Sequence, residues 1–397
     1  MKKRTYPARK LVLVTLALSL LACEHLDDNL RDHTSGKDPL PSYVTLEEVA
    51  QILSSVPIGS SQMGEVHDAV TSSTGNGYDE EYTMKDLFET PGAGVGDSPV
   101  KASSKTYDTP LRALLTEAVT ARYGTKAADG GVSADEFLDA LTASDVQIYW
   151  PFSDGWDGET SPVITFDPED NSDKNLGFVA GDDGTLRSVV VDEEMARSRP
   201  VWVINRNDDA SFQSLEVLRR ENPDWGTGGG LISVKADAGG DIRTWVLRSF
   251  KANRCYDTWF AGASEFFVRC GAVENFTAAT VEDISLYTPS ITDFMIVVKR
   301  DQIGQEIPFN AVLVSEWTGQ LDNVAFMITE DDGGKRTTWH CSTKVTVKSK
   351  VFGIDIDLPL KSADDIVWRG QLSRRYVEKY SGKKGTFGDV ELALELL

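Results

Sequence analysis

From residue 146 to its end, the chain consists largely of short runs of β-branched and aromatic residues, and this pattern limits the fold more than any other feature. The runs at residues 163–166 and 201–204 are typical, because glycine, aspartate or asparagine lies close to them. Such runs predict strands joined by turns. We expect a β-rich segment over residues 146–240, ending in a glycine-rich loop, and an antiparallel β-sandwich over residues 241–397.

Residues 43–145 carry helical patterns instead. Thr45 and Glu48 form a capping box, in which the hydroxyl caps the helix and the carboxylate follows three residues later. Ser133 and Glu136 repeat the arrangement. Further helices are expected from Pro110 to a stop at Gly124 and over residues 84–88. The predicted fold class is therefore α+β and mainly β, with the helical region first.

One hairpin is predicted in detail near the C-terminus. Apolar residues alternate with polar ones on both sides of Phe352 and Gly353, and the phase of the alternation reverses there. A turn at these two residues would bring opposite charges and apolar partners together across the strands. It would place Lys350 opposite Asp355, Lys348 opposite Asp357 and Val347 opposite Leu358.

The N-terminus predicts export. Five basic residues precede an apolar run at residues 11–22, which is too short to cross roughly 30 Å of hydrocarbon but suits the core of a secretory signal. The run ends in Leu20-Leu21-Ala22-Cys23 and resembles the lipobox of bacterial lipoproteins. The resemblance implies a signal peptide over residues 1–22, cleavage before Cys23 and lipid attachment to the Cys23 sulfur.

The polar residues 23–42 read as a flexible tether, and Glu24, Asp27 and Asp28 stand at its beginning. This acidic start resembles the export signal of surface lipoproteins of the Bacteroidetes, and the whole chain resembles uncharacterised lipoproteins of that group. The resemblance implies lipid anchoring in the outer membrane with exposure at the cell surface. A position facing the periplasm is the alternative.

The negative net charge of the chain excludes some classes of binding partner. The net charge of −22 becomes about −27 when cleavage removes five positive and no negative residues. Such an acidic body lacks the basic surface that nucleic acids require. It should also be repelled by anionic head groups, so the lipid is its expected contact with the membrane. A glycan or a protein at the cell surface remains as the expected ligand.

Common catalytic motifs are absent from the sequence. The four histidines form no His-Glu-x-x-His motif, and no Gly-x-Ser-x-Gly elbow occurs. We therefore expect a non-catalytic binding or structural protein. The alternative is a carbohydrate-active hydrolase, for which Asp257 and Glu265 are the candidate carboxylate pair.

Trp150 and Trp156 are candidate ligand-binding residues, and Asp257 and Glu265 are added to them. Tryptophan beside aspartate offers an apolar face with polar neighbours, on which sugar rings stack. The alternative is that the tryptophans belong to the core and that the two acids only make structural hydrogen bonds.

Acidic turns suggest calcium as a cofactor. The candidate ligands lie in two turns of the predicted sandwich, and further acidic turns lie at residues 167–173 and 182–184. Calcium takes six to eight oxygen ligands, often from such loops. Acidic loops at one end of a sandwich would resemble C2-like calcium-dependent modules, whereas ordinary solvated turns are the alternative. The four candidate ligands are Asp331, Asp332, Asp364 and Asp365.

Three cysteines follow Cys23. Cys255 and Cys270 could close a disulfide loop in an oxidising compartment. The favoured interpretation is that these two and Cys341 are small apolar side chains in a core that needs no crosslink.

Overall fold

The computed structural model describes residues 39–89, 106–124, 131–181, 185–207, 212–221, 235–236 and 240–397. The expected signal peptide, Cys23, most of the tether and the turn at residues 182–184 lie outside this part of the chain. Residues 35–397 belong to one compact unit. Strands outnumber helices, which gather near the N-terminus, so the predicted α+β, mainly β class is confirmed.

The predicted helix caps are present. Ser133 and Glu136 cap each other reciprocally, as predicted. At α1 only half of the predicted capping box forms: the Thr45 hydroxyl accepts a hydrogen bond from the Glu48 amide at 3.1 Å, but the Glu48 carboxylate pairs with Arg122 at 2.6 Å. No helix among the described residues has the length and apolar character needed to cross a bilayer. The helices are α1 (Leu46–Ser54), α2 (Ser60–Gly75), α3 (Met84–Phe88), α4 (Leu111–Tyr123), α5 (Ala134–Thr142), α6 (Glu193–Ser198), α7 (Leu215–Glu221) and α8 (Arg374–Tyr380).

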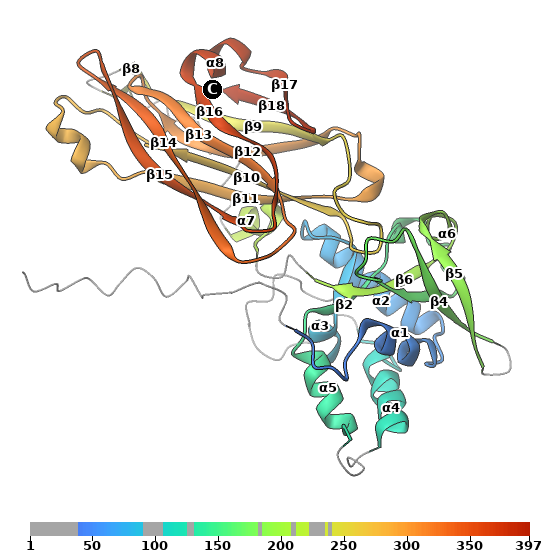
Figure 1. Cartoon of the computed structure of the whole chain (residues 1–397). Helices are drawn as coiled ribbons and strands as arrows, with labels where there is room; N and C mark the ends of the chain where they lie inside the picture. Colours follow the sequence, from blue (N-terminus) through green and yellow to red (C-terminus); the bar gives the residue numbers. More distant parts are fainter. Residues whose placement is uncertain are drawn as a thin grey trace, which may run out of the picture. The chain divides into compact units, whose positions relative to one another are not determined.

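A six-stranded sheet follows in the order β1-β2-β6-β3-β4-β5, and only its β3–β6 pair is parallel (Figure 1). Side chains from α1 to α5 share a core with Trp150 and Trp202 of this region. A second core includes Val163 and Val203 of the sheet together with Trp259 and Phe260 from the β9–β10 connection. The strands are β1 (Glu81–Thr83), β2 (Val146–Tyr149), β3 (Val163–Phe166), β4 (Lys174–Ala180), β5 (Leu186–Asp192) and β6 (Val201–Arg206).

The C-terminal strands form two antiparallel sheets that enclose a common core (Figure 1). Trp245 and Phe250 come from one sheet, Phe266 and Phe326 from the other, and all four are fully buried. The predicted sandwich is thus present. The first sheet contains β9 (Arg243–Ala252), β12 (Ile307–Trp317), β17 (Lys383–Phe387) and β18 (Val390–Leu396). The second contains β10 (Ser264–Ala272), β11 (Ser290–Val298), β13 (Leu321–Glu330), β14 (Arg336–Val347), β15 (Lys350–Lys361) and β16 (Asp365–Ser373).

Short elements complete the described fold. The strands β7 (Lys235–Ala236) and β8 (Gly240–Asp241) pair with each other. The 3-10 turns are η1 (Ser153–Gly155), η2 (Glu282–Leu286) and η3 (Arg300–Gln302).

The predicted hairpin exists, but its predicted turn is wrong. β14 and β15 turn at Lys348 and Ser349, which adopt φ values of 48° and 65°. Two successive positive φ angles match the twist of a two-residue hairpin, which normally favours asparagine or glycine at these positions. The earlier turn shifts the register of every pair. Val347 lies opposite Lys350, Ser342 opposite Asp355, His340 opposite Asp357 and Trp339 opposite Leu358.

Candidate functional site

A pocket of about 270 Å³ lies beside the turn that follows β2. Trp150, Phe152 and Trp156 supply its aromatic lining, and Arg199 and Asp301 are among its charged residues. Ligand sites for small molecules commonly occupy roughly 300–1,000 Å³, so this volume suits a small ligand. Both tryptophan candidates therefore line the pocket, but Trp150 is 1% exposed and belongs to the core, as the alternative expected, whereas Trp156 is half-buried.

The turn that forms one wall of the pocket is strained and firmly held. Phe152 adopts a left-handed conformation with a φ of 61°, which is unusual for a bulky residue. The buried Glu80 carboxylate accepts hydrogen bonds from the Phe152 amide at 3.1 Å and from the Ser153 amide at 2.9 Å. Lys299 lies 3.8 Å from the same carboxylate. Strain that the surroundings enforce is often found at functional sites.

Trp156 lines the pocket and also packs against two other aromatic rings. Its ring lies 5.6 Å from that of Trp150 and 5.2 Å from that of His67, measured between centroids. Its indole nitrogen donates a hydrogen bond to the Thr160 carbonyl at 3.1 Å. The ring is half-buried and fixed in orientation, which is what a stacking platform for a ligand requires.

Charged groups of both signs complete the pocket. Arg197 stacks 4.3 Å from the Phe152 ring centroid. Arg199 donates to the Ser161 carbonyl at 3.0 Å, while its buried Nε–H has no hydrogen-bond partner among the described residues. Hydrogen bonds from Thr160 and from the Glu159 amide lower the pKa of Asp157 to about 2, so this carboxylate is ionised at neutral pH.

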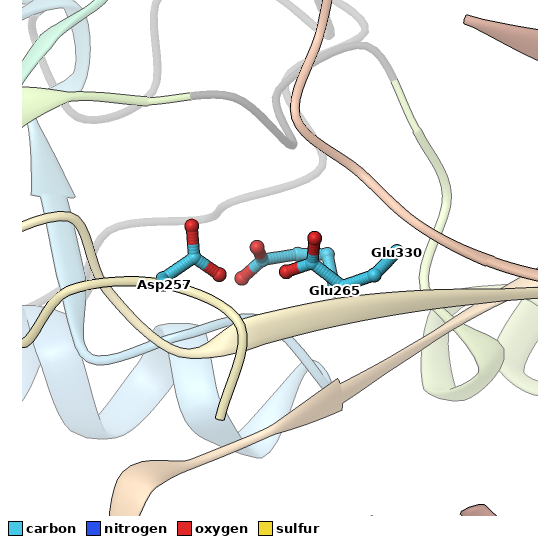
Figure 2. Close-up of side chains that lie close together, drawn as sticks. All are labelled: Asp257, Glu265 and Glu330. Carbon is cyan, nitrogen blue, oxygen red and sulfur yellow. The ribbon is translucent and has the colours of Figure 1, made fainter. Parts of the chain in front are cut away.

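A second site gathers three acidic side chains, which we call the acidic cluster: Asp257, Glu265 and Glu330. One carboxylate oxygen of each lies within 4.8 Å of the others (Figure 2). Glu265 stands at the start of β10 and Glu330 at the end of β13, which pair antiparallel, and Asp257 lies in the β9–β10 connection. Both glutamates are buried, at 4% and 0% exposure.

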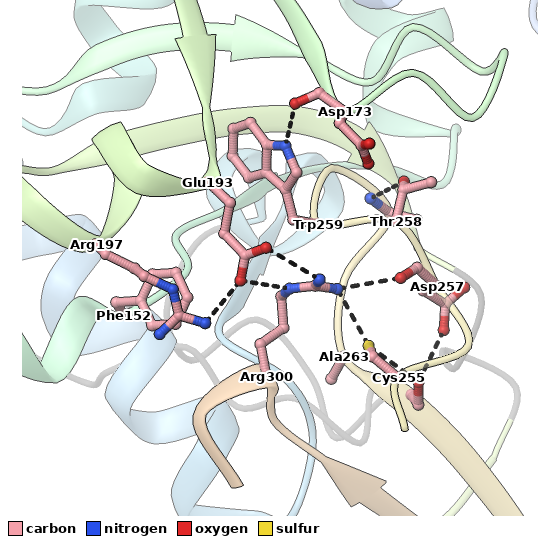
Figure 3. A network of polar contacts seen from close by, with 12 residues as sticks. Phe152, Asp173, Glu193, Arg197, Cys255, Asp257, Thr258, Trp259, Ala263 and Arg300 are labelled. Atoms are coloured by element: carbon pink, nitrogen blue, oxygen red, sulfur yellow. Dashed lines mark hydrogen bonds and ion pairs between the residues drawn. The ribbon is translucent and has the colours of Figure 1, made fainter. Parts of the chain in front are cut away.

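Arg300 fixes the loop that carries Asp257 (Figure 3). Its guanidinium donates to the Asp257 carbonyl and to the Cys255 sulfur, both at 3.1 Å. It also contacts the Glu193 carboxylate at 3.3 Å, and Glu193 pairs with Arg197 of the pocket at 2.7 Å. Arg197, Glu193 and Arg300 thus connect the pocket to the backbone of the loop that carries Asp257.

The spacing of the acidic cluster matches two kinds of chemistry, the binding of a hard cation and glycoside hydrolysis. Ligands on opposite sides of a calcium ion are roughly 4.6–5.2 Å apart, which matches the spread of these oxygens. The convergence of Asp257 and Glu265 also resembles the close carboxylate pair of retaining glycosidases. Of this pair, Asp257 is half-buried and Glu265 is 4% exposed.

The four aspartates predicted as calcium ligands have other partners. Asp331 forms a buried ion pair with Lys361 at 2.6 Å, and Asp364 accepts a hydrogen bond from the Lys361 amide at 2.9 Å. Asp365 lies 3.7 Å from Arg254, while Asp332 is exposed. In the described part of the chain, carboxylates at ligand spacing instead include Glu330, the residue just before Asp331.

The three described cysteines are free, and the alternative of a Cys255–Cys270 disulfide is not realised in this structure. Cys270 is buried in the sandwich core, as expected, whereas Cys255 and Cys341 are only half-buried, so the expectation of three core cysteines holds for Cys270 alone. Burial raises the pKa of the Cys255 thiol, so the neutral thiol predominates at neutral pH. A thiol in this state is a poor nucleophile.

Comparisons with protein-family models, with curated proteins and with solved structures found no match to this chain. The assignment of function therefore depends on the two sites and on the sequence features alone.

Proposed function

We propose that this chain is a lipid-anchored, non-catalytic binding protein of the bacterial cell envelope, and that its ligand occupies the pocket at Trp156. The observation that carries the proposal is the pocket itself, in which half-buried aromatic rings lie beside charged groups of both signs. Such a combination of apolar surface with a few fixed polar groups is typical of small-molecule sites. The lipobox and the acidic tether support the envelope location.

Replacing Trp156 by alanine should weaken ligand binding at least tenfold, because the variant loses the largest fixed apolar surface of the pocket. The full-length protein would be screened by thermal shift against sugars, amino acids, nucleosides and organic acids, and hits measured by calorimetry. Trp339→Ala is the matched control, since Trp339 is also half-buried but lies in β14 outside the pocket. Binding that survives in Trp156→Ala, or catalytic turnover of a ligand, contradicts the proposal.

The acidic cluster favours a second candidate function, the binding of a divalent cation such as calcium. One oxygen from each of three carboxylates lies within 4.8 Å of the others, and carboxylate oxygens are ligands that calcium takes. Three protein oxygens fall short of the six to eight that calcium takes, so water or carbonyl groups would complete the shell.

Calcium should raise the unfolding temperature of the wild-type protein by several degrees and leave that of Glu330→Gln unchanged. A ligand at about 100 times its Kd stabilises a protein by about 2.7 kcal/mol, which produces a shift of this size. Asp170→Asn is the control, because it removes an exposed acid from a solvated turn. Equal shifts in the wild type and Glu330→Gln, or none with calcium, magnesium or manganese, would exclude the cation site.

A further inference from the structure

We infer that the ligand of the pocket is a neutral saccharide of one or two sugar units, an inference that rests on the proposed function. The pocket brings together an aromatic platform, donors and acceptors within about 270 Å³. A sugar ring presents an apolar C–H face to Trp156 and hydroxyl groups at its edge, each of which both donates and accepts hydrogen bonds.

The polar groups of the pocket match the edge of a sugar. The Arg199 Nε–H is a buried donor without a partner among the described residues, and a ring or hydroxyl oxygen can accept its hydrogen bond. Asp154 and Asp157 are exposed acids on the same wall and accept from hydroxyl groups. A ligand without acceptors would leave the Arg199 Nε–H unpaired, and a ligand without donors could not bind to Asp154 or Asp157.

Charge selects a neutral sugar over an acidic one. The pocket is lined by four carboxylates, those of Glu80, Asp154, Asp157 and Asp301, against the two guanidinium groups of Arg197 and Arg199. Arg197 is already paired with Glu193 at 2.7 Å. Lys299, next to the pocket, lies 3.8 Å from Glu80 and 3.6 Å from Asp154 and offsets part of their charge, which leaves Asp157 and Asp301 as the further acids of the lining. The chain as a whole carries −22. Uronic acids, phosphates and nucleotides therefore meet a repulsive field.

The ligand touches both major parts of the fold. Trp156, Arg197 and Arg199 belong to the segment built around the six-stranded sheet, whereas Asp301 lies in η3, directly after β11 of the sandwich. Asp301 follows Arg300, whose guanidinium bridges Glu193 and the Asp257 carbonyl (Figure 3). The wall at Asp301 is thus fixed by the same contacts that hold the two parts together.

The test is calorimetric titration of the full-length protein in a detergent without a sugar head group. The probes are neutral hexoses and their disaccharides, galacturonate, an aliphatic diamine, amino acids and nucleosides. Neutral saccharides should bind at least tenfold more tightly than galacturonate. Trp156→Phe should keep more affinity than Trp156→Ala, because a smaller ring still stacks. Arg199→Met should lose affinity several-fold, whereas the control Trp339→Ala should bind like the wild type.

The outcomes separate this inference from the function on which it rests. If only a diamine, amino acid or nucleoside binds, and binding depends on Trp156, the pocket is a ligand site but the saccharide assignment is wrong. Preference for galacturonate also overturns the assignment. If no probe binds, or if saccharide binding is equal in the wild type and both Trp156 variants, the inference and the proposed function fall together. Trp156→Phe and Arg199→Met keep the test decisive if Trp156→Ala does not fold.

Discussion

Replacing Cys23 by serine should prevent lipid attachment and leave the protein as a precursor with its signal peptide attached. The lipobox resemblance implies that the Cys23 sulfur receives the diacylglyceryl group before cleavage. Each buried methylene contributes about 0.8 kcal/mol to membrane binding, so two or more acyl chains anchor a protein stably. No helix in the described residues is suited to replace that anchor.

The measurement is fractionation and mass spectrometry of the protein expressed in a bacterial host. The wild type should pellet with the membranes and begin at a lipid-modified Cys23. Cys341→Ser is the matched control, because it makes the same substitution at a half-buried cysteine of the sandwich and should leave processing intact. Membrane association and precursor processing that are identical in Cys23→Ser and the wild type would disprove lipid anchoring.

Local sequence signals predicted the local structure well. Thr45 and Ser133 determine where α1 and α5 begin. Their hydroxyl groups accept hydrogen bonds from amides only three residues later in the chain, so the signal is local and can be recognised in the sequence. The N-cap of α2 is Gly59, which has no side chain; the Gln62 side chain supplies the cap by accepting a hydrogen bond from the Gly59 amide at 2.9 Å. This helix was not predicted separately. Its burial comes from tertiary packing, which single-sequence patterns do not contain.

The hairpin shows where pairing rules alone fail. A turn at Phe352 and Gly353 and a turn at Lys348 and Ser349 both align apolar partners across the strands, so the sequence pattern does not choose between them. The observed turn places non-glycine residues at positive φ, for which lysine and serine give no warning. The register of β14 and β15 therefore depends on contacts with the rest of the sandwich, such as the pairing of β14 with β13.

The candidate sites were predicted in part, for a related reason. Residue type identified Trp156, Asp257 and Glu265, since tryptophan beside aspartate and paired acids are recognisable in a sequence. Glu330 and Arg199 were missed, because they reach these sites through strand pairing and chain folding far from those motifs. Glu330 ends β13, which is buried on both faces, and Asp331 is buried as well, so no alternation in the sequence distinguished Glu330 from Asp331.

The buried ion pair between Asp331 and Lys361 shows how this acidic end of the sandwich is stabilised. The two side chains meet at 2.6 Å and are almost fully buried, and the Lys361 ammonium also lies 4.6 Å from the Phe212 ring centroid. Burial and the neighbouring Asp331 raise the pKa of Asp364 to about 7, although a hydrogen bond from the Lys361 amide opposes them. One ammonium therefore stands among several acids that have little access to water.

Replacing Lys361 by methionine should lower the free energy of unfolding by about 3–5 kcal/mol at pH 8, because Asp331 then stays buried without its cation. Urea denaturation followed by tryptophan fluorescence measures the change. The loss should be smaller at pH 5, where Asp364, whose pKa is raised to about 7, is protonated and no longer repels Asp331. Asp364 adds a pH dependence of its own, because its pKa is higher in the folded protein than in the unfolded chain. Its contribution to the free energy of unfolding is fully present below about pH 4 and disappears as the pH rises through 7.

Two further variants isolate the pair as the cause. The double variant Asp331→Leu/Lys361→Met should be more stable than Lys361→Met alone, since it removes the buried charge together with its partner. Lys384→Met is the matched control: Lys384 contacts Glu306 at the same 2.6 Å, but both side chains are exposed, and its loss should leave the urea midpoint nearly unchanged. If Lys361→Met and Lys384→Met unfold at the same urea concentration, burial does not set the strength of the Asp331–Lys361 pair.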